Sequence, residues 1–481
     1  MDENLIYLNG LNGIGPGYLV EPFAPEALRQ RARGLGTADL FGSEDHAQAL
    51  QDRESAGAAH YDLAPYINPA NLLQTGWGLV FPADMEQTRI DAILEALAEL
   101  VVLRQGQAAG RYKLYTGDNA PQPGESADQW VARNGLQPGS VNPAKIPYYL
   151  TLVGSPAELS FQFQFELDVQ FAVGRLDFNR LDDYAKYARS VKTAEAPQAA
   201  KSTKNAVFFG VANPDDPSTQ LSSQRLIPPL YSFAQGDELA PLGWQSELAI
   251  SGQATKDYLL SQLASKQPPA FLFTASHGLG YPLSHSSQLT TQGALVCQDW
   301  PGPLQWTSAP NPEMYLAADD IPAGANLTGS LAFLFACFSA GVPEWDDYAL
   351  AKGKERLRLA QPPFTSALAQ KLLSLPGGGA LAVIGHVGRA WGYSFGWSGS
   401  DSEPESFKSM LFQLFSGDPV GHAMEPLNQR YAQISTLLSE DFQKARYDLD
   451  YDARLLSGHW IANNDARSYA ILGDPAVKFN V

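Results

Sequence analysis

From about residue 78 onward, the hydrophobic positions alternate between short apolar runs and longer segments with helical spacing. Residues 79–81 and 148–153 are apolar runs of strand length. Between them, the apolar positions of residues 88–103 recur every three or four residues, which predicts an amphipathic helix. Apolar and polar residues alternate over 161–166, which predicts a strand with one apolar face. A strand at 169–173 and a helix over 182–193 complete this first α/β set.

A second α/β set follows residues 195–204, which have the composition of a linker. Its predicted strands and helices alternate along the chain, so we expect a mostly parallel sheet covered by helices. The strands are expected at 206–209, 270–275, 331–336 and 380–384, and the helices near 255–264 and 363–375. The linker divides the chain into an N-terminal α/β subdomain at 1–200 and a second domain at 201–481. Before the first set, residues 5–8 predict a short strand and 31–60 a surface loop.

The composition narrows the class of protein. A net charge of −18 leaves no basic footprint of the kind that nucleic-acid binding requires. Two cysteines, Cys297 and Cys337, exclude a disulfide framework and fit a reducing compartment. The apolar runs are too short to span a membrane, and the first residues lack the pattern of a secretory signal. We therefore expect a cytoplasmic protein without a bound metal or cofactor, and without a membrane or nucleic-acid partner.

Two of the predicted strands end in reactive side chains. The strand at 270–275 leads into Ser276-His277-Gly278, and the strand at 331–336 leads into Cys337. Ligand sites of parallel α/β sheets lie at the carboxyl ends of the strands. If the two strands are neighbours, His277 and Cys337 emerge side by side.

This pair of residues suits nucleophilic catalysis. A cysteine acts as a nucleophile in its thiolate form, which a neighbouring imidazolium stabilises. His277 can also protonate a leaving amine, because histidine titrates near neutral pH. The backbone N–H groups of Gly278 and Cys337 are candidates for an oxyanion hole.

His-Gly after one apolar strand and Ala-Cys after a second, in this order, resemble the clan CD cysteine peptidases, which include caspases, gingipains and CHAT-type domains. Residues 472–477 and 149–154 also look like gingipain and CHAT sequences. The resemblance implies a caspase-like three-layer αβα sandwich preceded by a second, non-catalytic α/β subdomain, with His277 and Cys337 as a catalytic dyad. Phe335 stands where caspases have glutamine, so a demand for aspartate in the substrate is not implied.

Several further residues are candidates for substrate binding, each with a structural alternative. Glu344, Asp346 and Asp347 follow the cysteine and form either an acidic pocket for a basic substrate residue or a solvated face. Asp215 and Asp216, after the strand at 206–209, are a second acidic candidate. The other candidates are Asp299 and Trp300, which a structural turn explains equally well, and His386, Arg389 and Trp391, of which His386 could be a core histidine.

The leading hypothesis is a cysteine endopeptidase that acts on a protein or peptide through a thioester and is restrained until an activating signal or a regulatory protein releases it. Residues 31–60 and 342–362 are the loops where an activation segment is expected. Two alternatives stay open. One is a catalytically idle caspase-like scaffold or sensor, and the other is a thiol hydrolase or transferase for a non-peptide acyl group. Cys297 is interpreted as a strand residue rather than the nucleophile, and His285 has too few neighbouring ligands for zinc.

Overall fold

The computed structural model describes residues 9–20, 24, 63–137, 139, 141–199, 201, 203–350, 356–396, 404–447 and 452–481. The predicted strand at 5–8 and the whole of the predicted loop at 31–60 lie outside these residues. A ten-stranded sheet runs through the molecule in the order β3-β2-β4-β5-β18-β17-β12-β8-β6-β7. Eight of the nine neighbouring strand pairs in this sheet are parallel, and the pair β17–β18 is antiparallel. The expectation of a mostly parallel α/β sheet is therefore confirmed.

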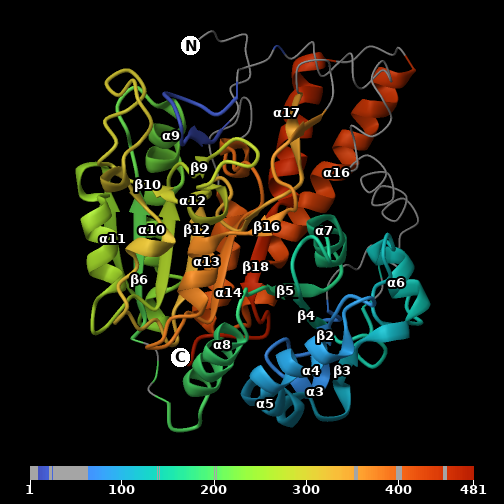
Figure 1. The fold of residues 1–481 in the computed structure, drawn as a ribbon. Coiled ribbons are helices and arrows are strands. Elements are labelled where there is room, and N and C mark those ends of the chain that lie inside the picture. The colour runs from blue at the N-terminus through green and yellow to red at the C-terminus, as the bar shows by residue number, and fades with distance from the viewer. Residues whose placement is uncertain are drawn as a thin grey trace.

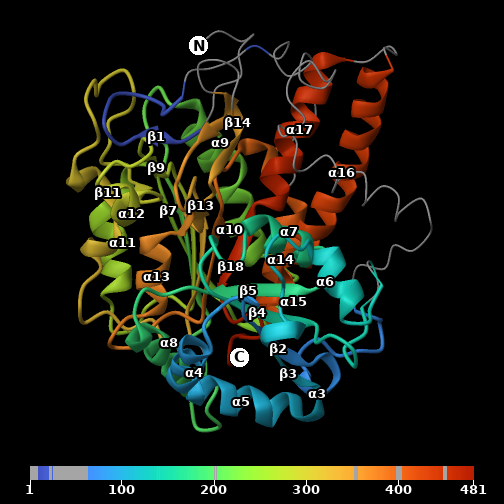
Figure 2. The same ribbon diagram turned by 45° about the vertical axis from the view of Figure 1, so that its right-hand side comes forward.

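One half of this sheet contains the predicted second set of strands, whose residues are almost all buried because helices cover both faces. Helices α11 and α13 lie on one face and α10 and α14 on the other, which makes three layers (Figures 1 and 2). The strands are β6 (Asn205–Gly210), β7 (Gln245–Ile250), β8 (Phe271–Ala275), β12 (Leu331–Phe335) and β17 (Ala382–His386). The helices are α9 (Pro217–Arg225), α10 (Ile227–Ala234), α11 (Lys256–Leu263), α13 (Ala367–Leu373) and α14 (Glu405–Ser416).

The first α/β set forms the other half of the sheet, drawn in blue to green at the lower right of Figure 1. Its strands are β2 (Trp77–Val80), β3 (Tyr112–Tyr115), β4 (Tyr149–Val153) and β5 (Ala172–Leu176). Its helices are α3 (Leu72–Thr75), α4 (Gln87–Ala96), α5 (Ala98–Ala108), α6 (Ala127–Arg133), α7 (Phe161–Asp168) and α8 (Leu181–Ala194). The single helix predicted over 88–103 is two helices, because the chain leaves helical geometry at Leu97.

Strand β18 (Tyr469–Gly473) joins the two halves. It lies between β17, to which it is antiparallel, and β5, to which it is parallel. The strands of the first set therefore run opposite to those of the second. Helices α15 (Val420–Ala423), α16 (Glu425–Arg446) and α17 (Ala453–Arg467) precede β18 in the chain. The predicted linker lies between α8 and β6, but both sides of it contribute to one sheet, and the division at residue 200 stays a prediction.

The strand predicted at 161–166 is wrong, since this segment forms α7. The Ser160 hydroxyl caps the helix by accepting the N–H of Phe163 at 3.0 Å. The rings of Phe161 and Phe165 stack one turn apart, with centroids 6.3 Å apart, whereas Phe163 packs into a different hydrophobic cluster. The helix is therefore buried on two sides, and apolar residues on both sides mimic the period of a strand.

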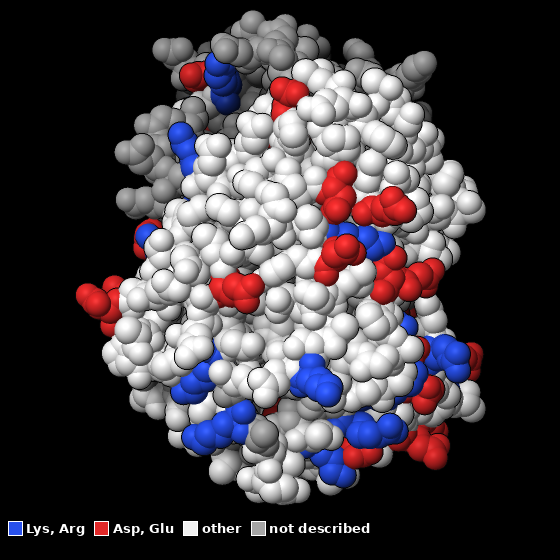
Figure 3. Space-filling view, turned by 90° about the vertical axis from the view of Figure 1, so that its left-hand side faces the viewer, with Lys and Arg blue, Asp and Glu red and all other residues white. Residues whose placement is uncertain are grey.

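The charged side chains on the face shown in Figure 3 are spread around a broad uncharged area, with most basic groups near one end and most acidic ones along one side. Among the described residues, no helix is both long and apolar enough to cross a membrane.

Candidate active site

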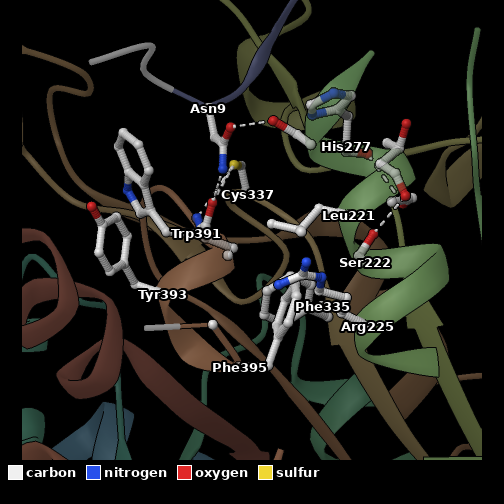
Figure 4. A pocket seen from close by; sticks show the side chains of 16 residues that line it. Asn9, Leu221, Ser222, Arg225, His277, Phe335, Cys337, Trp391, Tyr393 and Phe395 are labelled. Carbon is white, nitrogen blue, oxygen red and sulfur yellow. Dashed lines mark hydrogen bonds between the residues drawn. The ribbon is translucent and has the colours of Figure 1, made fainter. Parts of the chain in front are cut away.

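His277 and Cys337 follow two neighbouring strands of the sheet, as predicted. Strands β8 and β12 pair in parallel with Ala275 opposite Phe335, so the next residues of both strands emerge at the same edge. Both side chains line one cavity of about 440 Å³ (Figure 4). The sequence therefore brings the two reactive groups together through strand register alone.

Cys337 is held in a tight turn and is only 2% exposed. Its sulfur accepts a hydrogen bond from the N–H of Ala390 at 3.3 Å. Burial raises the pKa of the Cys337 thiol to about 11, although the charge of Arg389 and the N–H groups of Ala390 and Gly278 act in the opposite direction. Phe338 then turns the chain with a φ of 62°, a conformation that non-glycine residues rarely adopt. At neutral pH the sulfur in this structure is therefore a protonated thiol.

Gly278 lies against the backbone of Cys337. A Cβ atom at this position would come within 1.8 Å of the Cys337 carbonyl oxygen and 2.8 Å of its carbonyl carbon. Only glycine allows this approach, because backbone atoms cannot give way as the end of a flexible side chain can. The predicted oxyanion-hole residues, Gly278 and Cys337, are thus in direct contact, and their role stays a prediction.

His277 has a carboxylate partner in Asp216, the residue that caps the N-terminus of α9. Its Nε2 lies 2.5 Å from Oδ2 of Asp216, and both side chains are almost fully buried. Burial raises the pKa of Asp216, but the charge of His277 and hydrogen bonds from His277, Tyr18 and Thr219 outweigh it, so the net pKa is lowered. Asp216 is thus an ionised partner of the histidine. The sequence predicted it as a substrate-binding residue, whereas the structure places it against His277.

Asp299 and Trp300, which were predicted as substrate-binding residues, contact different parts of the molecule. The Trp300 ring packs edge-on against His277, with the centroids 6.2 Å apart, and is 1% exposed. Asp299 accepts the N–H of Lys256 at 2.8 Å, at the start of α11. Neither residue lines the cavity.

The acidic residues after Cys337 are paired with arginines and lie outside the cavity. Glu344 accepts a hydrogen bond from Nε of Arg358 at 3.0 Å, and Asp346 forms an ion pair with Arg389 at 2.8 Å. Asp347 pairs with Arg356 at 2.9 Å and with Arg467 at 2.6 Å. Glu344 and Asp347 instead line a separate cavity of about 540 Å³ beside α7. Part of the expected activation loop at 342–362 forms two strands, β14 (Trp345–Leu350) and β15 (Arg356–Arg358).

The remaining predicted residues divide between the core and the cavity. His386 is fully buried and its Nε2 contacts the carbonyl oxygen of Asp465 at 3.0 Å, so it is a core histidine. Arg389 is also buried, whereas Trp391 lines the cavity. Cys297 is fully buried next to strand β10 (Leu295–Val296), and His285 stacks on Tyr281. Asp215 has a φ of 56° in the turn before α9.

The sequence did not identify the N-terminal segment as part of the site. Asn9 lines the cavity, donates its side-chain amide to the carbonyl oxygen of Ala390 at 2.6 Å and accepts the hydroxyl of Ser218 at 3.1 Å. In Figure 4 it lies beside Cys337, across from Trp391. The cavity also has aromatic and aliphatic walls that were not predicted. They are formed by Leu221, Phe335, Tyr393 and Phe395.

A buried Cys–His pair at the carboxyl edge of a three-layer, mostly parallel sheet defines a clan CD cysteine peptidase. The family model of peptidase family C25 matches residues 117–480, about three quarters of the chain. The chain therefore belongs to peptidase family C25. No curated protein matches it.

Solved structures of similar fold share little sequence with this chain. The Arg-specific cysteine proteinase gingipain R is 10% identical, with a TM-score of 0.49 and coverage of 87% of this chain and 80% of that one. The complex of the Porphyromonas gingivalis RgpB pro- and mature domains gives 11% identity, a TM-score of 0.46 and coverage of 84% and 79%. The Saccharomyces cerevisiae separase–securin complex gives 12% identity, a TM-score of 0.33 and coverage of 71% and 16%.

Proposed function

We propose that this protein is a cysteine endopeptidase in which Cys337 attacks the carbonyl carbon of a peptide bond and His277 serves as acid and base. The observation that carries the proposal is that Cys337 and His277 line one cavity while Oδ2 of Asp216 lies 2.5 Å from Nε2 of the imidazole. A buried carboxylate on a histidine fixes the ring and stabilises the imidazolium, which in turn stabilises a thiolate.

The reaction follows from these positions. The thiolate forms a C–S bond to the peptide carbonyl, and the N–H groups of Gly278 and Cys337 stabilise the oxyanion. His277 gives its proton to the leaving amine as the C–N bond breaks, which leaves a thioester on Cys337. The neutral imidazole then takes a proton from water, whose oxygen attacks the thioester; as the C–S bond breaks, the acid is released and the thiolate–imidazolium pair is restored.

The walls of the cavity favour a large apolar side chain before the cleaved bond. Its described lining residues include Phe335, Phe395 and Leu221 but no aspartate or glutamate, and Arg225 contributes a positive charge. An acidic pocket for a basic substrate residue was one of two alternatives for Glu344, Asp346 and Asp347, but these carboxylates pair with arginines elsewhere. The arrangement therefore supports cleavage after an uncharged, bulky residue.

Two observations support the proposal that the enzyme is restrained. Burial keeps Cys337 protonated at neutral pH, since it raises the pKa of the thiol to about 11. Asn9 is bonded across the cavity to Ala390 and Ser218, where a substrate would have to enter. We propose that Asn9 slows the entry of substrate and that an activating signal displaces it.

Mass spectrometry of a diverse peptide library incubated with the wild type, Cys337→Ala and Cys297→Ser tests the proposal. Cleavage is expected from the wild type and Cys297→Ser, because Cys297 is buried away from the cavity, and is expected to be absent for Cys337→Ala. Cleavage by Cys337→Ala would refute the proposed nucleophile.

The buried thiol also keeps the second candidate, an idle module, in consideration. A peptidyl acyloxymethyl ketone separates the two, because it modifies only a cysteine that is activated in a substrate-binding site. Labelling of Cys337 would exclude the idle module, and failure to label Cys337 at any probe sequence would favour it.

A further inference from the structure

The N-terminal segment, defined here as residues 9–20, forms one wall of the site rather than a tail beside it. Its strand β1 (Leu11–Asn12) pairs in parallel with β9 (Leu279–Gly280), the residues that follow His277 and Gly278. The N–H of Leu11 donates to the carbonyl oxygen of Gly278 at 3.1 Å, and the N–H of Gly13 donates to that of Gly280 at 2.8 Å. Figure 1 shows this segment in blue beside α9 and β9.

The segment then turns back and brings Tyr18 to the catalytic histidine. The N–H of Leu19 donates to the carbonyl oxygen of Gly10 at 2.9 Å, which closes the turn. The Tyr18 ring meets the His277 ring edge-on, with centroids 5.7 Å apart and an interplanar angle of 78°. Both ends of the turn are thus fixed, and the tyrosine is held against the imidazole.

The hydroxyl of Tyr18 completes the hydrogen bonding of Asp216. It donates to Oδ1 at 2.9 Å, while Oδ2 accepts the Thr219 hydroxyl at 3.1 Å and lies against Nε2 of His277. Burial and the charge of Asp216 raise the pKa of Tyr18 well above its usual range, so the hydroxyl stays a donor throughout the working pH range. Without it, the N–H of Ser218 at 3.2 Å is the one hydrogen bond that Oδ1 keeps from the described residues.

We propose that Tyr18 is a positioning residue for the catalytic pair: its hydroxyl keeps Asp216 ionised and turned towards His277. The inference rests on the proposed function of Cys337 and His277. A carboxylate that accepts several hydrogen bonds has a lowered pKa, and each bond also restricts its rotation. The same segment therefore carries Asn9 across the cavity and supplies a group that the chemistry uses.

This double role restricts how the enzyme can be activated. If the whole segment were removed, Asp216 would lose a donor and His277 would lose a ring contact. Activation has to shift Asn9 and leave Tyr18 in place.

The full-length Tyr18→Phe variant tests the proposal, because it removes the hydroxyl and keeps the ring. Tyr258→Phe is the matched control, since the Tyr258 hydroxyl also donates to a carboxylate, Oε1 of Glu247 at 2.6 Å, between α11 and β7. Two pH profiles are measured for each protein: kcat/KM on a peptide substrate, and the rate of Cys337 alkylation by iodoacetamide, followed by mass spectrometry.

For Tyr18→Phe, we expect the acid limb of both profiles to move up by about one pH unit, because a hydrogen bond to a charged group is worth roughly that much in pKa. At neutral pH, kcat should fall about tenfold with little change in KM, because the tyrosine does not contact the cavity. Tyr258→Phe should match the wild type in both profiles.

A uniform loss of rate with an unmoved acid limb would overturn the proposal, because it would show a purely structural role. Wild-type behaviour of Tyr18→Phe would overturn it as well. If the wild type cleaves no peptide, the proposed function fails, but the alkylation profile still decides whether Tyr18 acts on the cysteine through Asp216 and His277.

Discussion

Replacing Asp216 by asparagine removes the charge beside His277 and keeps the shape of the side chain. The carboxylate is fully buried and its Oδ2 lies 2.5 Å from Nε2 of His277. Two opposite charges with centres about 4 Å apart attract by about 4 kcal/mol at an effective dielectric constant of about 20. Because each 1.36 kcal/mol in the barrier is about a factor of ten, we expect kcat to fall by about 100- to 1,000-fold.

The change should affect rate and not specificity, because Asp216 contacts the histidine and does not line the cavity. Steady-state kinetics on two peptides that differ only in the residue before the cut measures this, with Asp299→Asn as a control on the same edge of the sheet. A large change in substrate preference at an unchanged kcat would refute the reasoning and return Asp216 to a substrate-binding role.

The same variant has a pH-dependent effect on stability. The pKa of Asp216 is lowered in the folded protein, so its charge stabilises the fold at pH values above the unfolded pKa, about 4. This contribution is lost as the pH falls through the folded pKa. Urea unfolding should therefore show the largest difference between the wild type and Asp216→Asn at neutral pH and a shrinking difference below about pH 4.

Three further changes probe the site. Gly278→Ala should abolish cleavage and Cys337 labelling, because its Cβ would come within 1.8 Å of the Cys337 carbonyl oxygen; retained labelling at the wild-type rate would contradict the steric argument. Asn9→Ala should speed alkylation of Cys337 at pH 7 at least about threefold by opening the cavity, whereas Asn12→Ala, whose side chain accepts the N–H of the nearby Ile14, should leave it unchanged. Leu221→Glu places a carboxylate in the cavity wall and should raise the ratio of cleavage after Arg to cleavage after Leu by about tenfold; an unchanged ratio would show that the cavity does not receive that side chain.

The sequence predicted that His277 and Cys337 lie at one edge of the sheet because strand pattern and strand pairing agree at this position. The runs before His277 and Cys337 are apolar throughout, as strands covered on both faces must be, and neighbouring parallel strands end at one edge. The same logic brought Asp216 to the correct edge. Its contact with His277 depends on where the cap of α9 meets a side chain that follows a neighbouring strand. The hydrophobic pattern of the sequence does not predict such a contact.

The sequence-based predictions that missed the structure did so for equally local reasons. Phe161, Phe163 and Phe165 followed a strand period because the helix they form is buried on two sides. Asn9 and Tyr18 escaped prediction because β1 spans only Leu11–Asn12, which is too short to give a pattern. The acidic-pocket interpretation of Glu344 counted carboxylates near Cys337 in the chain, but their arginine partners come from positions up to Arg467.

The position of β18 affects how the molecule is assembled. Strands β2 to β5 and the strands from β6 to β17 can each pair among themselves, but they become one sheet only when β18 enters between β5 and β17. Because β18 follows four α-helices, α14 to α17, that come after β17, synthesis delivers it after all its neighbours. Its arrival places Tyr469 beside His386, at the end of the strand whose continuation, at Ala390, holds the sulfur of Cys337. A nascent chain would therefore reach the complete geometry of its nucleophile only after β18 has left the ribosome, which would delay proteolytic activity until the rest of the protein is folded.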